Sequence, residues 1–217
     1  MADALPPTDA ARPAAGAKTE ACDDARVVAR TLRWLERAVI GLNLCPFAKA
    51  VHAKGQVHLA VSRASDAEGA LADLQREMQD LVALDATVRD TTLLVLPDAF
   101  ADFLNFNDFL DPAEALLDAL CLQGVLQIAS FHPRYQFAGT GPDDVTNCSN
   151  RAPWPTLHLL REDSVTRAVD AFPDAEAIFG ANLQTLRQLG AAGWAQLDVG
   201  PHVAGPAVPA RVAGAGE

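Results

Sequence analysis

Residues 131–162 hold most of the side chains in this chain that could do chemistry. Two histidines, His132 and His158, stand at the two ends of a long loop that is rich in polar residues and proline. The other candidates for binding a substrate lie between or just beyond them: Arg134, Tyr135, Asn147, Asn150, Arg151, Trp154, Arg161 and Glu162. Loops longer than roughly 12–15 residues are usually functional or disordered, and the aromatic residues and prolines here favour function.

Cys45 is the candidate nucleophile outside this loop. Pro46 suits the first position of a helix, so the spacing predicts that Cys45 caps a short helix. Free backbone N–H groups and the helix dipole lower the pKa of a thiol at such a cap. The alternative is a buried structural cysteine, because free cysteine is among the most buried residue types. Cys121 falls on an apolar helical stripe and is expected in the core.

Three functions fit these residues. In the first, Cys45 is a nucleophile and His132 or His158 is its base, in acyl or amide transfer or hydrolysis on a small metabolite. Arginine and asparagine side chains would then orient an anionic or amide-bearing substrate or stabilise an oxyanion. In the second, a metal such as zinc or iron is held by His132, His158 and one of Asp143, Asp144 or Cys45.

The third function is a binding or structural module without chemistry, in which the loop is a rigid plug and its polar groups satisfy buried backbone atoms. The metal spacing matches no standard motif, so we assign no metal ligands, and the cofactor stays unknown. Whether the chain is an enzyme stays open between the first and third hypotheses. Trp154–Pro155 is an aromatic–proline bond and hence a candidate for a cis peptide.

The composition argues against nucleic acid and membrane as partners. The chain has 217 residues, 50% of them hydrophobic, and a net charge of −11. An acidic surface repels nucleic acid, and no apolar stretch approaches the roughly 20 residues that span a bilayer. The start has no apolar run of a secretory signal, and no Cys-x-x-Cys spacing occurs. We expect a cytoplasmic protein with reduced thiols that binds neither nucleic acid nor membrane.

Hydrophobic periodicity predicts the elements that position these residues. We expect a single α/β domain at residues 23–199 between disordered tails at 1–22 and 200–217. About four strands are expected, at 56–62, 91–96, 125–131 and 156–161, packed by helices. One helical segment is predicted to be split, with Asp111 and Pro112 restarting it, and the last helix is predicted to end at Gly190.

The direction of the strands decides where the histidines meet. Helical crossovers predict that the first three strands run parallel. The loop before the fourth strand holds no obvious crossover helix, so this strand is predicted to be antiparallel to the third. Such pairing brings His132 and His158 to the same end of the sheet.

Three segments resemble a known family. They are Gly-Leu-Asn-Leu-Cys-Pro-Phe at 41–47, Ser-Phe-His-Pro-Arg-Tyr-Gln-Phe-Ala-Gly-Thr at 130–140, and Asn-Arg-Ala-Pro-Trp-Pro-Thr-Leu-His-Leu-Leu-Arg-Glu at 150–162. They resemble a bacterial family labelled domain of unknown function 1415, over most of residues 31–194. The resemblance implies a cytoplasmic bacterial protein and brings no activity, cofactor or catalytic residue with it.

Overall fold

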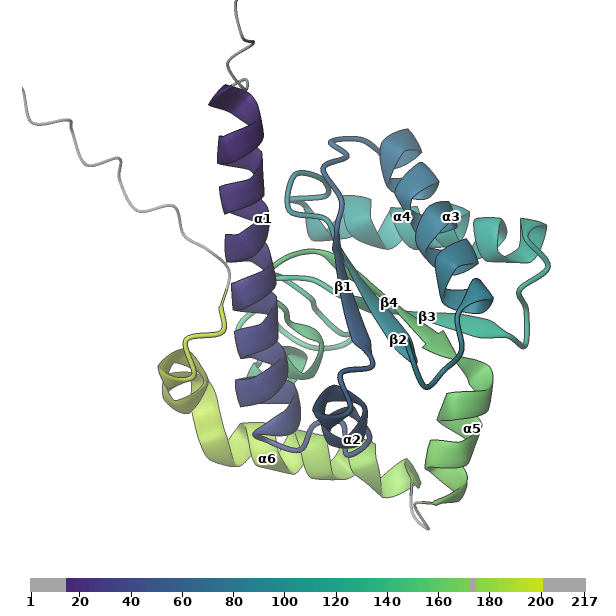
Figure 1. Cartoon of the computed structure of the whole chain (residues 1–217). Helices are drawn as coiled ribbons and strands as arrows, with labels where there is room; N and C mark the ends of the chain where they lie inside the picture. The colour runs from purple at the N-terminus through teal and green to yellow at the C-terminus, as the bar shows by residue number, and fades with distance from the viewer. Residues whose placement is uncertain (1–14, 172–174, 201–217) are drawn as a thin grey trace, which may run out of the picture.

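A four-stranded mixed sheet lies at the centre of the computed structural model, which describes residues 15–171 and 175–200 (Figure 1). The strands are β1 (Val57–Val61), β2 (Thr91–Val95), β3 (Leu126–Phe131) and β4 (Thr156–Arg161), in the order β1-β2-β4-β3. β1 is parallel to β2, and β4 is antiparallel to both β2 and β3. The α/β fold, the shared direction of the first three strands and the reversed fourth strand are therefore confirmed.

β4 lies between β2 and β3, which the sequence reading did not anticipate. Leu157 and Leu159 on this strand are fully buried, whereas most of β3 is only half-buried. The interior position pairs both edges of β4 with neighbouring strands and leaves β3 at the edge of the sheet.

Helices α3 (Ala67–Ala83) and α4 (Phe103–Ala119) cover one face of the sheet (Figure 1). Asp66 caps α3 by accepting a hydrogen bond from the Gly69 amide, and Asp102 caps α4 in the same way. The apolar stripes of both helices pack on Leu94, Leu157 and Leu159 in the largest core cluster.

The predicted split of α4 at Pro112 is wrong, because the helix runs without a break through this proline. Buried Phe106 and Phe109 precede Pro112, and buried Ala113 and Leu117 follow it on the same stripe. Packing of this stripe on the sheet holds both halves in line despite the missing hydrogen bond of the proline.

The opposite face is covered by α1 (Ala15–Trp34), which continues as the π-helix η1 (Leu35–Ile40), and by the short α2 (Ala48–Ala53). α1 begins inside the segment expected to be disordered, and the remainder of that segment and residues 201–217 lie outside the described residues. Trp34 is buried against Phe131, with ring centroids 5.1 Å apart, and its Nε1–H donates to the carbonyl of Arg151.

Two further helices complete the described chain, α5 (Glu162–Asp170) and α6 (Ala175–Gln196). Gly190 interrupts α6 with φ 65° and ψ 173°, as expected from its position after the apolar stripe. The prediction that Cys121 belongs to the core is wrong: α4 ends before it, and Cys121 is exposed with a φ of 57°. None of the helices in the described ranges has the length and apolarity needed to cross a membrane.

Candidate functional site

The long loop at 132–155 is folded around the side chain of Asn147 and the 3₁₀ helix η2 (Val145–Asn150). Asn147 is fully buried; its Oδ1 accepts from the Phe137 amide at 3.0 Å and from Thr140 Oγ1 at 2.8 Å. Its Nδ2 donates to the Gly141 carbonyl at 2.9 Å. Asn147 therefore holds the loop together through these hydrogen bonds.

All peptide bonds of the described residues are trans, including Trp154–Pro155.

The three arginines expected near the histidines do not converge. Arg134 donates to the Ala101 carbonyl at 2.6 Å and pairs with Asp102 at 3.3 Å. Arg151 donates to the carbonyls of Tyr135 and Pro142, at 3.1 and 2.6 Å. Arg161 donates to the carbonyl of Leu81 near the end of α3 and to those of Leu84 and Arg89 in the chain that joins α3 to β2. Each guanidinium therefore fastens a different piece of backbone.

His132 and His158 lie on opposite faces of the sheet. His132 is 1% exposed and packs between Phe103 and Phe106 of α4, each with its ring centroid 5.4 Å away. Its Nε2–H donates to the Phe100 carbonyl, and its Nδ1 accepts from the Arg134 amide, both at 3.0 Å. Burial lowers the pKa of His132. Both ring nitrogens of this histidine are therefore engaged in the core.

The remaining loop candidates also make structural contacts. Tyr135 packs on Phe103 and Phe137, with ring centroids about 5 Å away. Asn150 donates to the Ser130 carbonyl at 3.3 Å. Trp154 is half-buried, and Glu162 starts α5, where its amide donates to the Val125 carbonyl.

Cys45 is not a helix cap, contrary to the sequence prediction. α2 begins at Ala48, with Phe47 as its N-cap, so Cys45 sits in the preceding turn. The π-helix η1 ends just before this turn, and the Cys45 amide donates to the Val39 carbonyl at 3.4 Å. Cys45 is half-buried, whereas Cys148 is 4% exposed and burial raises the pKa of its thiol.

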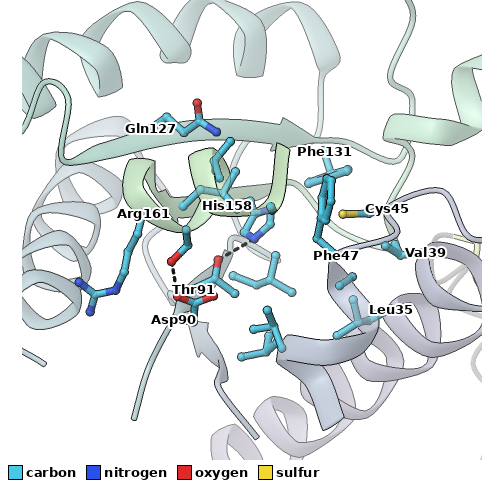
Figure 2. A pocket seen from close by; sticks show the side chains of 18 of the residues that line it. Leu35, Val39, Cys45, Phe47, Asp90, Thr91, Gln127, Phe131, His158 and Arg161 are labelled. Carbon is cyan, nitrogen blue, oxygen red and sulfur yellow. Dashed lines mark hydrogen bonds between the residues drawn. The ribbon is translucent and has the colours of Figure 1, made fainter. Parts of the chain in front are cut away.

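Cys45 and His158 open onto one pocket, the central pocket, on the α1 face of the sheet (Figure 2). Its volume is about 300 Å³. Apolar side chains from α1, η1, α2, the sheet and α5 make most of its wall: Trp34, Leu35, Val39, Phe47, Ala48, Val51, Val57, Leu93, Phe131, Leu160, Val165 and Ala168. The other lining residues are Cys45, Asp90, Thr91, Gln127, His158, Arg161 and Ser164.

Hydrogen bonds fix the tautomer of His158. The Thr91 hydroxyl donates its proton to the Leu159 carbonyl, so it accepts from His158 Nε2–H, 2.7 Å away. Nδ1 then carries the lone pair, and it makes no hydrogen bond to any described residue. Burial lowers the pKa of His158 to about 4, so its ring is neutral at physiological pH.

Phe131 lies between the thiol and the imidazole. Figure 2 shows the Phe131 ring between the side chains of Cys45 and His158, with Arg161 directed away from the pocket. The ring centroids of Phe131 and His158 are 6.1 Å apart. His158 therefore faces the interior of the pocket, with the Phe131 ring between it and Cys45.

A second cavity of about 280 Å³ lies against the same cysteine. It shares Val39, Cys45 and Phe131 with the central pocket, and η2 and α6 supply much of the rest. Its lining residues are Val39, Leu44, Cys45, Phe131, Phe137, Ser149, Asn150, Phe179, Asn182 and Leu183. Cys45 thus lies where the two cavities adjoin.

No three histidine, cysteine, aspartate or glutamate side chains come together as metal ligands anywhere in the described ranges. The two histidines of the metal hypothesis are separated by the sheet itself.

The sequence did not predict four of the residues that line the central pocket: Asp90, Thr91, Phe131 and Ser164. Asp90 accepts a hydrogen bond from the Ser164 hydroxyl at the pocket wall. Phe131 ends β3 and His132 follows it directly, so the alternation of side chains in an extended chain was the available signal that the two face opposite ways.

The sheet, its helical layers and the central pocket define an α/β protein with a cavity of ligand size on one face. The chain belongs to the family described as "Protein of unknown function (DUF1415)", whose model matches residues 26–196. This match confirms the family that three segments of the sequence resemble. No curated protein and no solved structure matches the chain.

Proposed function

We propose that the protein binds a neutral, largely apolar small molecule in the central pocket. The observation that carries this proposal is a volume of about 300 Å³ walled mainly by aliphatic and aromatic side chains. Native interiors are close-packed and rarely leave voids much larger than a water molecule. An apolar cavity of about 150 Å³ is already enough to hold benzene. Small-molecule sites typically begin at about 300 Å³.

His158 supplies the polar recognition in this proposal. Its Nδ1 is a neutral acceptor inside an apolar wall, because Nε2–H is held by Thr91. A ligand with one hydroxyl or amide N–H group satisfies that acceptor, and a purely hydrocarbon ligand leaves it without a partner.

The charges at the pocket favour a neutral ligand over the anionic one expected from the sequence. The Arg161 guanidinium is occupied by backbone carbonyls, and the acid at the wall is Asp90. A buried anion there would gain no free cation and would meet a carboxylate. The amide-bearing metabolite expected from the sequence remains within the proposal.

A matched pair of fluorescent probes tests the proposal. N-phenylnaphthylamine is neutral, and anilinonaphthalenesulfonate adds one sulfonate to the same rings. We expect the neutral probe to bind at least about tenfold more tightly, which corresponds to roughly 1.4 kcal/mol. Ala168→Phe, which fills the pocket from α5, should abolish binding; Ala72→Phe on the exposed side of α3 is the control. Equal affinities of the two probes, or binding that survives Ala168→Phe, would contradict the proposal.

A second function, acyl or amide transfer through Cys45, is favoured by the place of this thiol at the wall of the central pocket. The Cys45 sulfur would attack a carbonyl carbon, the bond from that carbon to the leaving group would break, and the thiol proton would leave with that group. Water would then hydrolyse the thioester and release the acid. His158 would accept a hydrogen bond from the ligand, because Phe131 separates it from Cys45.

Covalent labelling tests this second function. Nitrophenyl butyrate should release about one equivalent of nitrophenol rapidly and leave a butyryl group on Cys45, seen by peptide mass spectrometry. Cys45→Ala should lose both signals, and Cys121→Ala should keep both. Turnover or acylation that is unchanged in Cys45→Ala would rule out this thiol as the nucleophile.

Cytoplasmic location is part of the same proposal. The described cysteines, Cys45, Cys121 and Cys148, are free thiols. Free thiols of this kind are typical of proteins that work in a reducing compartment.

A further inference from the structure

The second cavity adjoins the central pocket at three residues that line both. Val39, Cys45 and Phe131 line both cavities, so a molecule bound in either one can contact Cys45. The two cavities nevertheless differ in composition. Apolar side chains make most of the wall of the central pocket, which also contains charged residues, whereas the polar groups of the second cavity are hydroxyl and carboxamide groups from η2 and α6.

The polar groups of the second cavity are all neutral, since none of its described lining residues is charged. Asn182 donates one N–H to the Leu44 carbonyl at 2.9 Å, which fixes the amide with its oxygen still able to accept. The Ser149 hydroxyl donates within its own loop, to Thr146 or Asn150, and keeps its lone pairs. Such groups bind hydroxyls and carboxamides without favouring a charge.

Two phenylalanines add an apolar surface to this cavity. Phe137 comes from the long loop and is half-buried, and Phe179 comes from α6 and is 63% exposed. A single exposed phenylalanine is ordinary on a protein surface. At the rim of a cavity lined by amides, its face is available to a flat group of a ligand.

We propose that the second cavity binds the neutral polar part of a molecule whose apolar part fills the central pocket, with the junction of the two parts at Cys45. The ligand class is then an amide or ester that joins an apolar acyl group to a neutral, planar amide-bearing or hydroxyl-bearing group. This inference rests on the proposed binding of an apolar ligand in the central pocket. If Cys45 acts as an acyl acceptor, the group held in the second cavity is the one that leaves with the thiol proton.

Alkylation of Cys45 reports on the second cavity directly. Iodoacetanilide carries a neutral aromatic amide, and iodoacetate carries a charge. The rate constant of each reagent is measured at Cys45 and at the exposed Cys121 in the same sample, by peptide mass spectrometry. After division by the Cys121 rates, we expect Cys45 to prefer iodoacetanilide by at least about tenfold, as expected when a buried polar environment rejects a charge.

Three variants separate the two cavities. Phe179→Ala should reduce the preference at least about fivefold; Leu104→Ala is the matched control, since Leu104 is 68% exposed on α4 and remote from both cavities. Ala168→Phe fills the central pocket and should leave the preference intact. Loss of the preference in Ala168→Phe would assign it to the central pocket and overturn this inference alone. Unchanged rates in Phe179→Ala, or a Cys45 that is inert while Cys121 reacts, would also overturn it.

Discussion

His158 shows how one residue of the central pocket links the site to stability. Its pKa is lowered by burial to about 4, against an unfolded value near 6.5. The unfolded chain therefore takes up a proton at pH values where the folded chain does not, and stability falls as the pH drops from about 6.5 to about 4. His158 alone should contribute about 3 kcal/mol to this loss.

Urea unfolding at pH 7.5 and at pH 5 measures this effect. The free energy of unfolding should be lower at pH 5, and His158→Gln, which keeps an N–H for Thr91, should reduce the difference between the two pH values. His132 also has a pKa lowered by burial, so part of the difference should remain in the variant. An identical pH dependence in both proteins would show that the imidazole of His158 titrates normally in the folded state.

His132 is expected to act on stability and not on binding. His132→Ala removes an imidazole packed between two phenylalanines and leaves the Phe100 carbonyl and the Arg134 amide without their partners. We expect the free energy of unfolding to fall by about 3 kcal/mol. The affinity for N-phenylnaphthylamine should stay within about twofold, because His132 lies on the other face of the sheet. If His132→Ala has normal stability but no longer binds the probe, His132 belongs to the binding site.

At the scale of elements, Pro112 lies inside α4 although proline disfavours a helix interior, and packing on the sheet keeps the helix intact. A proline in a helix interior lowers the free energy of unfolding by about 3 kcal/mol relative to alanine. The rigid proline ring also lowers the conformational entropy of the unfolded chain, which offsets about 0.4–1 kcal/mol of that loss. Pro112→Ala should therefore raise the free energy of unfolding by roughly 2–2.6 kcal/mol, as measured from denaturant midpoints. Asp111→Ala, an exposed neighbour without the backbone effect, should change it by less than about 0.5 kcal/mol. A destabilised Pro112→Ala would mean that the core needs the bend made by this proline.

The same helix marks where sequence reading succeeds and fails. Periodicity located α3, α4 and the four strands, because apolar stripes depend on neighbours in the chain. The break assigned at Pro112 and the cap assigned at Cys45 were local rules, and tertiary packing overrode both. Burial of Phe106 and Leu117 on one stripe keeps α4 whole, and the turn after η1 moves the start of α2 to Ala48.

At the scale of the whole molecule, strand register decides which residues form the site. Phe131 pairs with Thr156 and Ala129 pairs with His158 across β3 and β4. Side chains alternate along each strand, so this register puts His158 and Phe131 on the α1 face and His132 on the α4 face. The sequence predicted that both histidines reach one end of the sheet, but the face of each depends on pairing between residues far apart in the chain. Cys45 and His158 line one pocket, and the sequence held no signal that Phe131 would lie between them.

Because the walls of the central pocket come from α1, η1, α2, the sheet and α5, a bound ligand should stabilise the whole fold and not one element. N-phenylnaphthylamine at ten times its Kd should raise the free energy of unfolding by about 1.4 kcal/mol. For a domain of this size that is a rise in Tm of roughly 3–6 °C, measured by circular dichroism. Ala168→Phe buries apolar surface in the empty pocket, so it should raise the Tm of the free protein and abolish the further rise with probe. A probe-induced rise that persists in Ala168→Phe would mean that the probe stabilises the fold from some other surface.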